Sequence, residues 1–100
     1  MEAITPTPDE VRLAGMLKAL GHPLRLAILS YVATHQGCIG NDVVLRTGRA
    51  QSTISQHLAV LQAAGLIEAV HEGHTTCYFV DDVVLSWMLT HLQLQIARDA

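Results

Sequence analysis

The segment Ala50-Gln-Ser-Thr-Ile-Ser-Gln-His-Leu58 decides the fold of this 100-residue chain. Its apolar residues Ile54 and Leu58, followed by Leu61, recur at the spacing of a helix that buries one face. The other residues from Gln51 to His57 are polar and carry no formal charge. The segment therefore predicts a helix with one side in the core and an uncharged, hydrogen-bonding surface on the other.

A short helix and a tight turn are expected before this segment. Residues 42–47 form the short helix, with Asn41 as its expected cap and Gly48 as its end. The turn Gly48-Arg-Ala-Gln51 then sets the angle between the two helices. Two short helices joined in this way are a helix-turn-helix.

A β-hairpin is expected directly after the helix-turn-helix. Residues 66–71 and 74–80 are rich in strand-forming residues and are joined by Glu72-Gly73. Cys38-Ile39 forms a further short extended piece. A hairpin that follows a helix-turn-helix is the winged arrangement, and the chain is expected to be mainly α with a small β-hairpin.

Three more helices complete the predicted order α-α-(β)-α-α-β-β-α. Thr7, Pro8 and Glu10 predict a helix start with a capping box, giving a helix over 8–20. A second helix begins at His22-Pro23, and a last one covers 83–98 after Asp81-Asp82. The last helix is apolar over much of its circumference, which indicates burial on more than one side. Residues 7–100 are expected to form one domain after a flexible segment, 1–6.

The polar face of the segment 51–57 indicates DNA binding. Base edges in the major groove require side chains that both donate and accept hydrogen bonds, and glutamine can address adenine through two bonds. An ordinary solvated helix face is the alternative, but such faces usually carry Lys and Glu. The predicted DNA contacts are Arg46, Arg49, Gln51, Ser52, Thr53, Ser55, Gln56 and His57, with His71 and His74 at the tip of the wing.

The net charge of −3 argues mildly against DNA binding, because phosphate neutralisation makes such binding strong. Of the six Arg and Lys residues, only Arg46 and Arg49 belong to the presumed reading head. His57, His71 and His74 partly replace the missing bases, and each should gain proton affinity near a phosphate. DNA binding that strengthens from about pH 8 to about pH 6 follows from this interpretation. Simple exposed polar residues are an equally good interpretation of the same histidines.

Three stretches together resemble the ArsR/SmtB family of bacterial winged-helix repressors. They are residues 19–29, residues 52–61, and residues 65–68 with 72–73 and 78–79, within a resemblance that spans about 13–92. The resemblance implies a homodimer that holds two-fold symmetric operator DNA and releases it when an effector binds. It also implies dimerisation through the helices 8–20 and 83–98.

The chain departs from this family at several positions. Arg49 stands where an apolar residue is usual, Ala50 stands where a capping Ser or Thr is usual, and the wing tip His71-Glu-Gly-His74 is not basic. Of the four ligands of the last-helix zinc site, Asp82 is matched, whereas Val84, Gln95 and Arg98 occupy the other positions. We therefore predict no metal at that site, and the sequence names no cofactor.

Cys38 and Cys77 are the candidate effector-sensing residues. The winged-helix layout puts the short strand at 38 beside the last strand of the hairpin, so the two thiols are expected to be neighbours. A pair of thiols there could form a disulfide or bind arsenite, or bind a metal with the help of a histidine. Two small, buried and inert residues are the alternative.

Several other function classes are not supported by the sequence. It contains no catalytic triad, phosphate loop or acidic pair, so an enzyme is not expected. It has neither a membrane-spanning run nor a secretory signal, which predicts a cytoplasmic protein. A winged-helix protein-interaction module without DNA binding is the remaining alternative, although it would favour aromatic or aliphatic anchors at 51–57.

Overall fold

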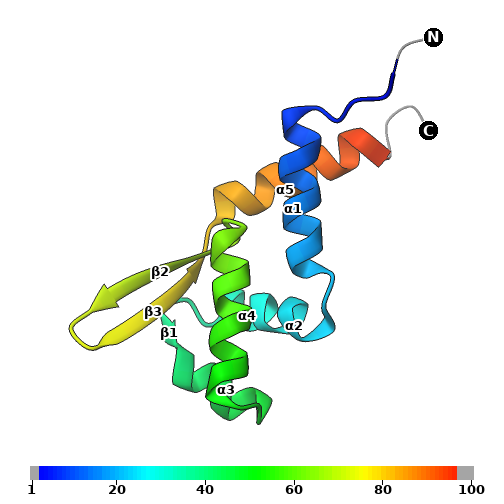
Figure 1. Ribbon diagram of the computed structural model, residues 1–100. Helices are drawn as coiled ribbons and strands as arrows, with labels where there is room; N and C mark the ends of the chain where they lie inside the picture. Colours follow the sequence, from blue (N-terminus) through cyan, green and yellow to red (C-terminus); the bar gives the residue numbers. More distant parts are fainter. Residues whose placement is uncertain (1–2, 97–100) are drawn as a thin grey trace.

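The computed structural model describes residues 3–96, which form five helices and one small sheet (Figure 1). This architecture confirms the predicted fold class and element order. The last helix begins one residue before its predicted start, and residues 97 and 98 lie outside the described part. The elements are α1 (Pro8–Leu20), α2 (Pro23–Thr34), β1 (Cys38–Ile39), α3 (Gly40–Thr47), α4 (Gln51–Ala63), β2 (Ile67–Glu72), β3 (Thr75–Val80) and α5 (Asp82–Ile96).

Side-chain caps begin α1 and α5 as the sequence predicts. The Thr7 hydroxyl accepts the Glu10 N–H at 3.1 Å, and the Glu10 carboxylate accepts the Thr7 N–H at 2.9 Å. Asp81 Oδ1 accepts the N–H groups of Val83 and Val84, each at 3.1 Å. Both helices thus have donors in their first turn satisfied by residues next to them in the sequence.

Two local predictions are wrong by one or two residues. Asn41 does not cap α3, because the chain passes directly from β1 into a helix that begins at Gly40. The Asp42 carboxylate instead accepts the N–H of Ile39 at 3.0 Å. The hairpin turn lies at Gly73-His74 rather than at Glu72-Gly73, since Glu72 still pairs with Thr75. Gly73 adopts a φ of +61°, which a residue without Cβ reaches at little cost.

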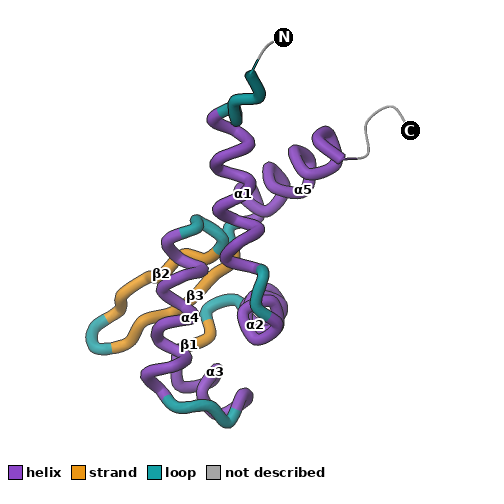
Figure 2. The backbone as a smooth tube through the Cα atoms, turned by 45° about the vertical axis from the view of Figure 1, so that its right-hand side comes forward, coloured by secondary structure: helices purple, strands orange, loops and turns teal. Residues whose placement is uncertain are grey.

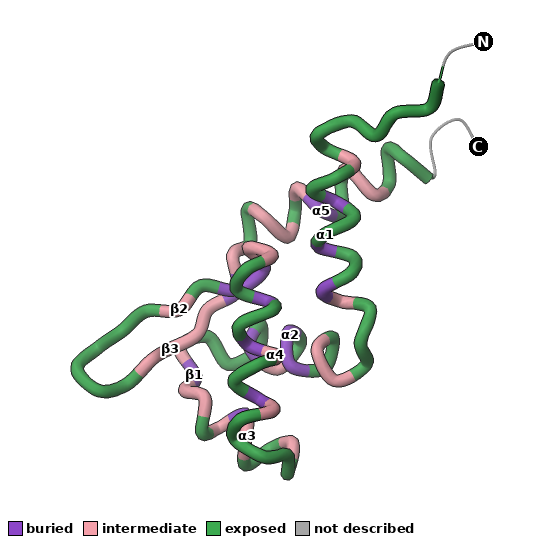
Figure 3. The backbone as a smooth tube through the Cα atoms, in the orientation of Figure 1, coloured by how far each residue is buried: buried purple, intermediate pink, exposed green. Residues whose placement is uncertain are grey.

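The core lies where α2 and α4 pack on the three strands, whose order is β1-β3-β2 with antiparallel pairing. Ile54, Leu58 and Leu61 of α4 are buried as predicted, and Leu66 and Ile67 continue the core into the hairpin. In Figure 3 the buried residues gather around this junction, whereas the outer end of the hairpin is exposed. The wing is therefore anchored at its base and solvated at its tip.

The helices α1 and α5 extend away from the winged head, and they give the molecule dimensions of 55 × 24 × 23 Å (Figures 1 and 2). Leu13, Met16 and Met88 bury part of the surface between the two helices. Trp87 is stacked with His91 at 4.0 Å and lies under the Arg12 guanidinium at 4.1 Å. Apolar side chains nevertheless remain exposed on both helices, among them Val11 of α1 with Leu89, Leu94 and Ile96 of α5.

Candidate nucleic-acid interface

The turn between α3 and α4 is set by Gly48. This residue has a φ of +68°, and its N–H donates to the carbonyl of Val44 at 2.9 Å, which ends α3. No atom lies within 4 Å of the place where a Cβ would stand. Glycine is therefore favoured at this position by the left-handed backbone and not by a lack of space. The next helix begins after Ala50, which provides no side-chain cap.

The polar residues of α4 fall on three different arcs of the helix. Ser52 and Gln56 point away from the core and are exposed. Gln51 and Ser55 lie on the side of the helix that faces the wing. Thr53 and His57 lie on the opposite flank and are half-buried. The six residues predicted as one reading face are thus divided between an exposed central strip and two flanks of the helix.

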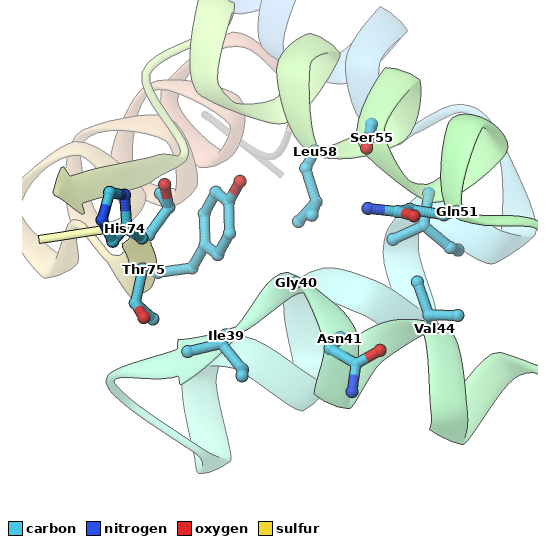
Figure 4. A pocket seen from close by; sticks show the side chains of 12 residues that line it. Ile39, Gly40, Asn41, Val44, Gln51, Ser55, Leu58, His74 and Thr75 are labelled. Carbon is cyan, nitrogen blue, oxygen red and sulfur yellow. The ribbon is translucent and has the colours of Figure 1, made fainter. Parts of the chain in front are cut away.

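The flank with Gln51 and Ser55 forms one wall of a cleft of about 280 Å³ (Figure 4). His74 and Thr75 of the hairpin stand on the opposite wall, and Asn41 of α3 lies below. Leu58, Val44 and Ile39 supply apolar parts of the lining. The cleft therefore brings a predicted wing residue and two predicted helix residues to one place, together with Asn41, which the sequence suggested only as a cap.

The wing tip carries the other predicted histidine. His71 Nδ1 and Thr76 Oγ1 lie 2.9 Å apart and join two residues that pair across the hairpin. Both His71 and His74 are exposed, and Glu72 lies between them in the sequence and is exposed too. The tip can thus present imidazole groups to a ligand, together with one carboxylate.

The two arginines of the reading head lie apart from each other. Arg46 lines a hollow with Ala27 and Tyr31 of α2 and is exposed. Arg49 is exposed in the turn before α4, close enough for its charge to act on His57. Arg49 thus belongs to the same surface as α4, whereas Arg46 faces the side where α3 meets α2.

Comparison with known proteins identifies the family of the chain. A sequence profile described as MarR family matches residues 22–75, just over half of the chain. The HTH-type transcriptional repressor SmtB of Mycobacterium tuberculosis (strain H37Rv) is 30% identical over 97 residues, covering 95% of this chain and 71% of the repressor. The chain belongs to the ArsR/SmtB family of winged-helix transcriptional regulators. The profile match covers α2 to the hairpin, whereas the SmtB match extends over nearly the whole chain.

Solved structures agree with membership of the ArsR/SmtB family. An ArsR-like transcriptional regulator from Rhodococcus sp. RHA1 superposes with a TM-score of 0.77 at 26% identity, covering 87% of this chain and 81% of that one. A homodimeric winged helix-turn-helix DNA-binding domain from Mycobacterium bovis, a possible ArsR-family regulator, gives 0.70 at 26% identity over 94% and 91%. This member of the family is a DNA-binding transcriptional regulator and not an enzyme, and the interaction-module alternative is not favoured.

The two cysteines lie on paired strands, as expected, but not directly opposite each other. In the β1–β3 ladder Cys38 lies opposite Tyr78, and Cys77 lies opposite Ile39. Because successive side chains alternate between the two faces of a sheet, the two thiols point to opposite faces. Both are free, and burial raises the pKa of the Cys38 thiol, with further contributions from the Asp42 carboxylate and from Cys77, which is near enough to act on it. This register argues against a dithiol site.

The described residues do not group into a metal site. Within residues 3–96, no three His, Cys, Asp or Glu side chains lie close enough together to hold an ion. Asp82, Val84 and Gln95 all lie on α5, whereas Arg98, the fourth position of the last-helix zinc site, lies outside the described residues. The same span contains no helix of the length and apolarity that a membrane crossing requires.

A contact that the sequence analysis missed joins α4 to α2. The rings of His57 and His22 lie with their centroids 4.7 Å apart. The pKa of His57 is lowered, first by burial and then by the nearby basic groups of His22, Arg25 and Arg49. The His22-Pro23 break marked the start of a helix, but only the packing of α2 on α4 brings His22 to the flank of the reading helix.

Proposed function

We propose that this regulator is a cytoplasmic, homodimeric repressor that binds two-fold symmetric operator DNA through α4 and the wing. Gln51, Ser52, Ser55 and Gln56 read base edges in the major groove, and Arg49, His71 and His74 contact the adjacent backbone. One observation carries the proposal. The exposed and wing-facing sides of the first turns of α4 hold four uncharged side chains, each able to form hydrogen bonds.

The chemistry of these side chains suits base recognition. A glutamine amide can donate to and accept from adenine at once, and serine hydroxyls can bond to several bases. No carboxylate is present between Gln51 and Leu61 to repel the DNA backbone. Thr53 and His57 are half-buried on the flank toward α2, so they are placed for the border of the groove rather than its floor. Arg46 lines a hollow with residues of α2, so the proposal gives it no base contact.

The exposed apolar residues of α1 and α5 support a homodimer. Val11, Leu89, Leu94 and Ile96 would be removed from water if the two helices packed against a second copy. The homodimeric relative from Mycobacterium bovis shares the fold of this chain over nearly its whole length. A dimer presents two reading helices, which together compensate for the few basic residues of each head.

Selection of bound DNA from a random library by the purified protein tests this function. We expect a two-fold symmetric site whose half-sites lie about 10 base pairs apart. Gln51→Ala and Gln56→Ala should relax the selected sequence, whereas Gln62→Ala is the matched control, because Gln62 is exposed on the same helix but near its other end. Recovery of no enriched sequence would contradict the proposal.

A further inference from the structure

Four nitrogen-rich side chains gather beside the reading helix and are not explained by base recognition. His22 and Arg25 come from the first residues of α2, Arg49 comes from the turn before α4, and His57 comes from α4 itself. We call these four residues the basic cluster. The histidine rings contact each other, and the charges of both arginines act on His57.

The structure fixes which atoms of α2 remain available to a ligand. His22 Nδ1 accepts the N–H of Leu24 at 3.1 Å, so the ring proton of the neutral form is on Nε2. Arg25 Nε donates to the carbonyl of Ala19 at 2.6 Å, which holds the guanidinium in place and leaves its terminal N–H groups. Each residue of α2 in the cluster is therefore oriented by one bond to backbone and keeps donors for another partner.

The charge of the cluster has one sign. The groups that act on His57 from the elements around it are His22 and Arg25 of α2 and Arg49 of the turn; the two arginines are positive, and none of the three is a carboxylate. The carboxylate of α3, Asp42, bonds to the N–H of Ile39 instead. Such a concentration of donors, with no carboxylate among the groups that act on His57, favours an anion of high charge density.

We infer that the basic cluster binds a backbone phosphate of the DNA at the border of the groove that α4 enters. This inference rests on the proposed function. His57 lies six residues after Gln51, which is about 9 Å along a helix with a rise of 1.5 Å per residue. The major groove is about 12 Å wide, so a helix whose first turn reaches the bases has its second turn beside the phosphates. The cluster adds His22 and Arg25 to the DNA-contacting surface, and it fixes orientation rather than sequence preference.

The salt dependence of DNA affinity reports directly on the number of phosphate contacts. Each phosphate neutralised contributes about 0.9 to the slope of log K against log salt concentration. Two variants remove donors of α2 that the proposed function does not assign to DNA: His22→Asn, which keeps a side-chain acceptor for the α2 cap, and Arg25→Gln, which removes one positive charge. Lys18→Gln is the control, because it removes one positive charge from α1 at a residue that lines a hollow with Arg25 but is not among the groups that act on His57.

For Arg25→Gln we expect a slope smaller by up to about 0.9 than that of the wild type, with equal losses of affinity on operator and on unrelated DNA. His22→Asn removes a hydrogen-bond donor and should weaken binding to both DNAs equally. Lys18→Gln should leave the slope unchanged. Thermal unfolding of each variant shows whether its fold is intact, and Arg25→Gln gives the answer if His22→Asn unfolds.

The outcomes separate this inference from the proposed function. A wild-type protein that binds no DNA overturns both. A wild type that binds DNA with the same affinity as His22→Asn, and with the same slope and affinity as Arg25→Gln, overturns the inference alone. Titration with inorganic phosphate at constant ionic strength tests a free anion as the ligand. If phosphate binds the wild type but not the variants, while the salt slopes remain equal, the cluster serves a free anion and the DNA contact is wrong.

Discussion

Cys38 lies opposite Tyr78, not opposite Cys77, in the antiparallel pairing of β1 with β3. The offset of one residue directs the two thiols to opposite faces of the sheet. Cys38 is buried and Cys77 is half-buried. An effector that requires both thiols at one point would therefore need the strands to re-pair.

We predict that the two thiols react separately. Cys77 should be alkylated well before Cys38, because Cys38 is buried and its raised pKa reduces the thiolate at neutral pH. Timed alkylation followed by peptide mass spectrometry measures the two rates, and Cys38→Ala and Cys77→Ala confirm the assignment. Rapid formation of an intramolecular Cys38–Cys77 disulfide under mild oxidation would contradict the register.

The core of the head should depend on Leu61. This side chain has no exposed surface, and its truncation to alanine should lower the free energy of unfolding by about 2–5 kcal/mol. The neighbouring Val60 is partly exposed, so Val60→Ala should cost much less and serves as the control. Urea unfolding at one fixed protein concentration compares them, since dimerisation would couple stability to concentration. Equal losses for the two variants would show that the core is misassigned.

The exposed apolar surface of α5 should hold the dimer together. Leu89 is 57% exposed in the single chain, and Leu89→Asp should shift the population to monomer. Leu45 is 72% exposed on α3, at the other end of the molecule, so Leu45→Asp should leave the oligomeric state unchanged. Sedimentation velocity measures both variants. A wild type that is monomeric at all concentrations would contradict the proposed dimer.

DNA binding should strengthen as the pH falls through the histidine range. In the free protein the pKa of His57 is lowered, mainly by burial and then by His22, Arg25 and Arg49. A nearby phosphate acts in the opposite sense and raises this pKa, so the complex takes up a proton. The affinity then rises as the pH falls from above the pKa in the complex to the lowered pKa of the free protein, and is constant below that.

Fluorescence anisotropy at constant ionic strength measures this pH dependence. His57→Gln should flatten it, and His35→Gln, at the other end of α2, should not. Equal wild-type affinity from about pH 8 to about pH 6 would remove the role of the histidines.

Sequence reasoning succeeds here where a residue acts on its near neighbours. The capping box of Thr7 and Glu10, the end of α3 at Gly48 and the missing cap at Ala50 are all local features. The prediction of a cap at Asn41 also rested on local sequence, and it is wrong because the pairing of β1 with β3 decides where the chain can turn into α3.

Contacts between distant segments were beyond such reasoning. The approach of His22 to His57 depends on how α2 packs on α4, and the stack of Arg12, Trp87 and His91 depends on how α1 packs on α5. The cysteines show the limit most clearly. Their strands could be paired from the sequence, but a shift of one residue in register reverses the face to which a side chain points.

Base recognition by α4 is the central claim, and the affinity of Gln56→Ala for two DNA duplexes tests it most directly. One duplex carries the selected operator and the other has the same composition in scrambled order. We expect a loss of about 1–3 kcal/mol on the operator and almost none on the scrambled duplex, with Gln62→Ala unchanged on both. Equal losses on the two duplexes, or no loss on the operator, would contradict recognition of bases by this helix.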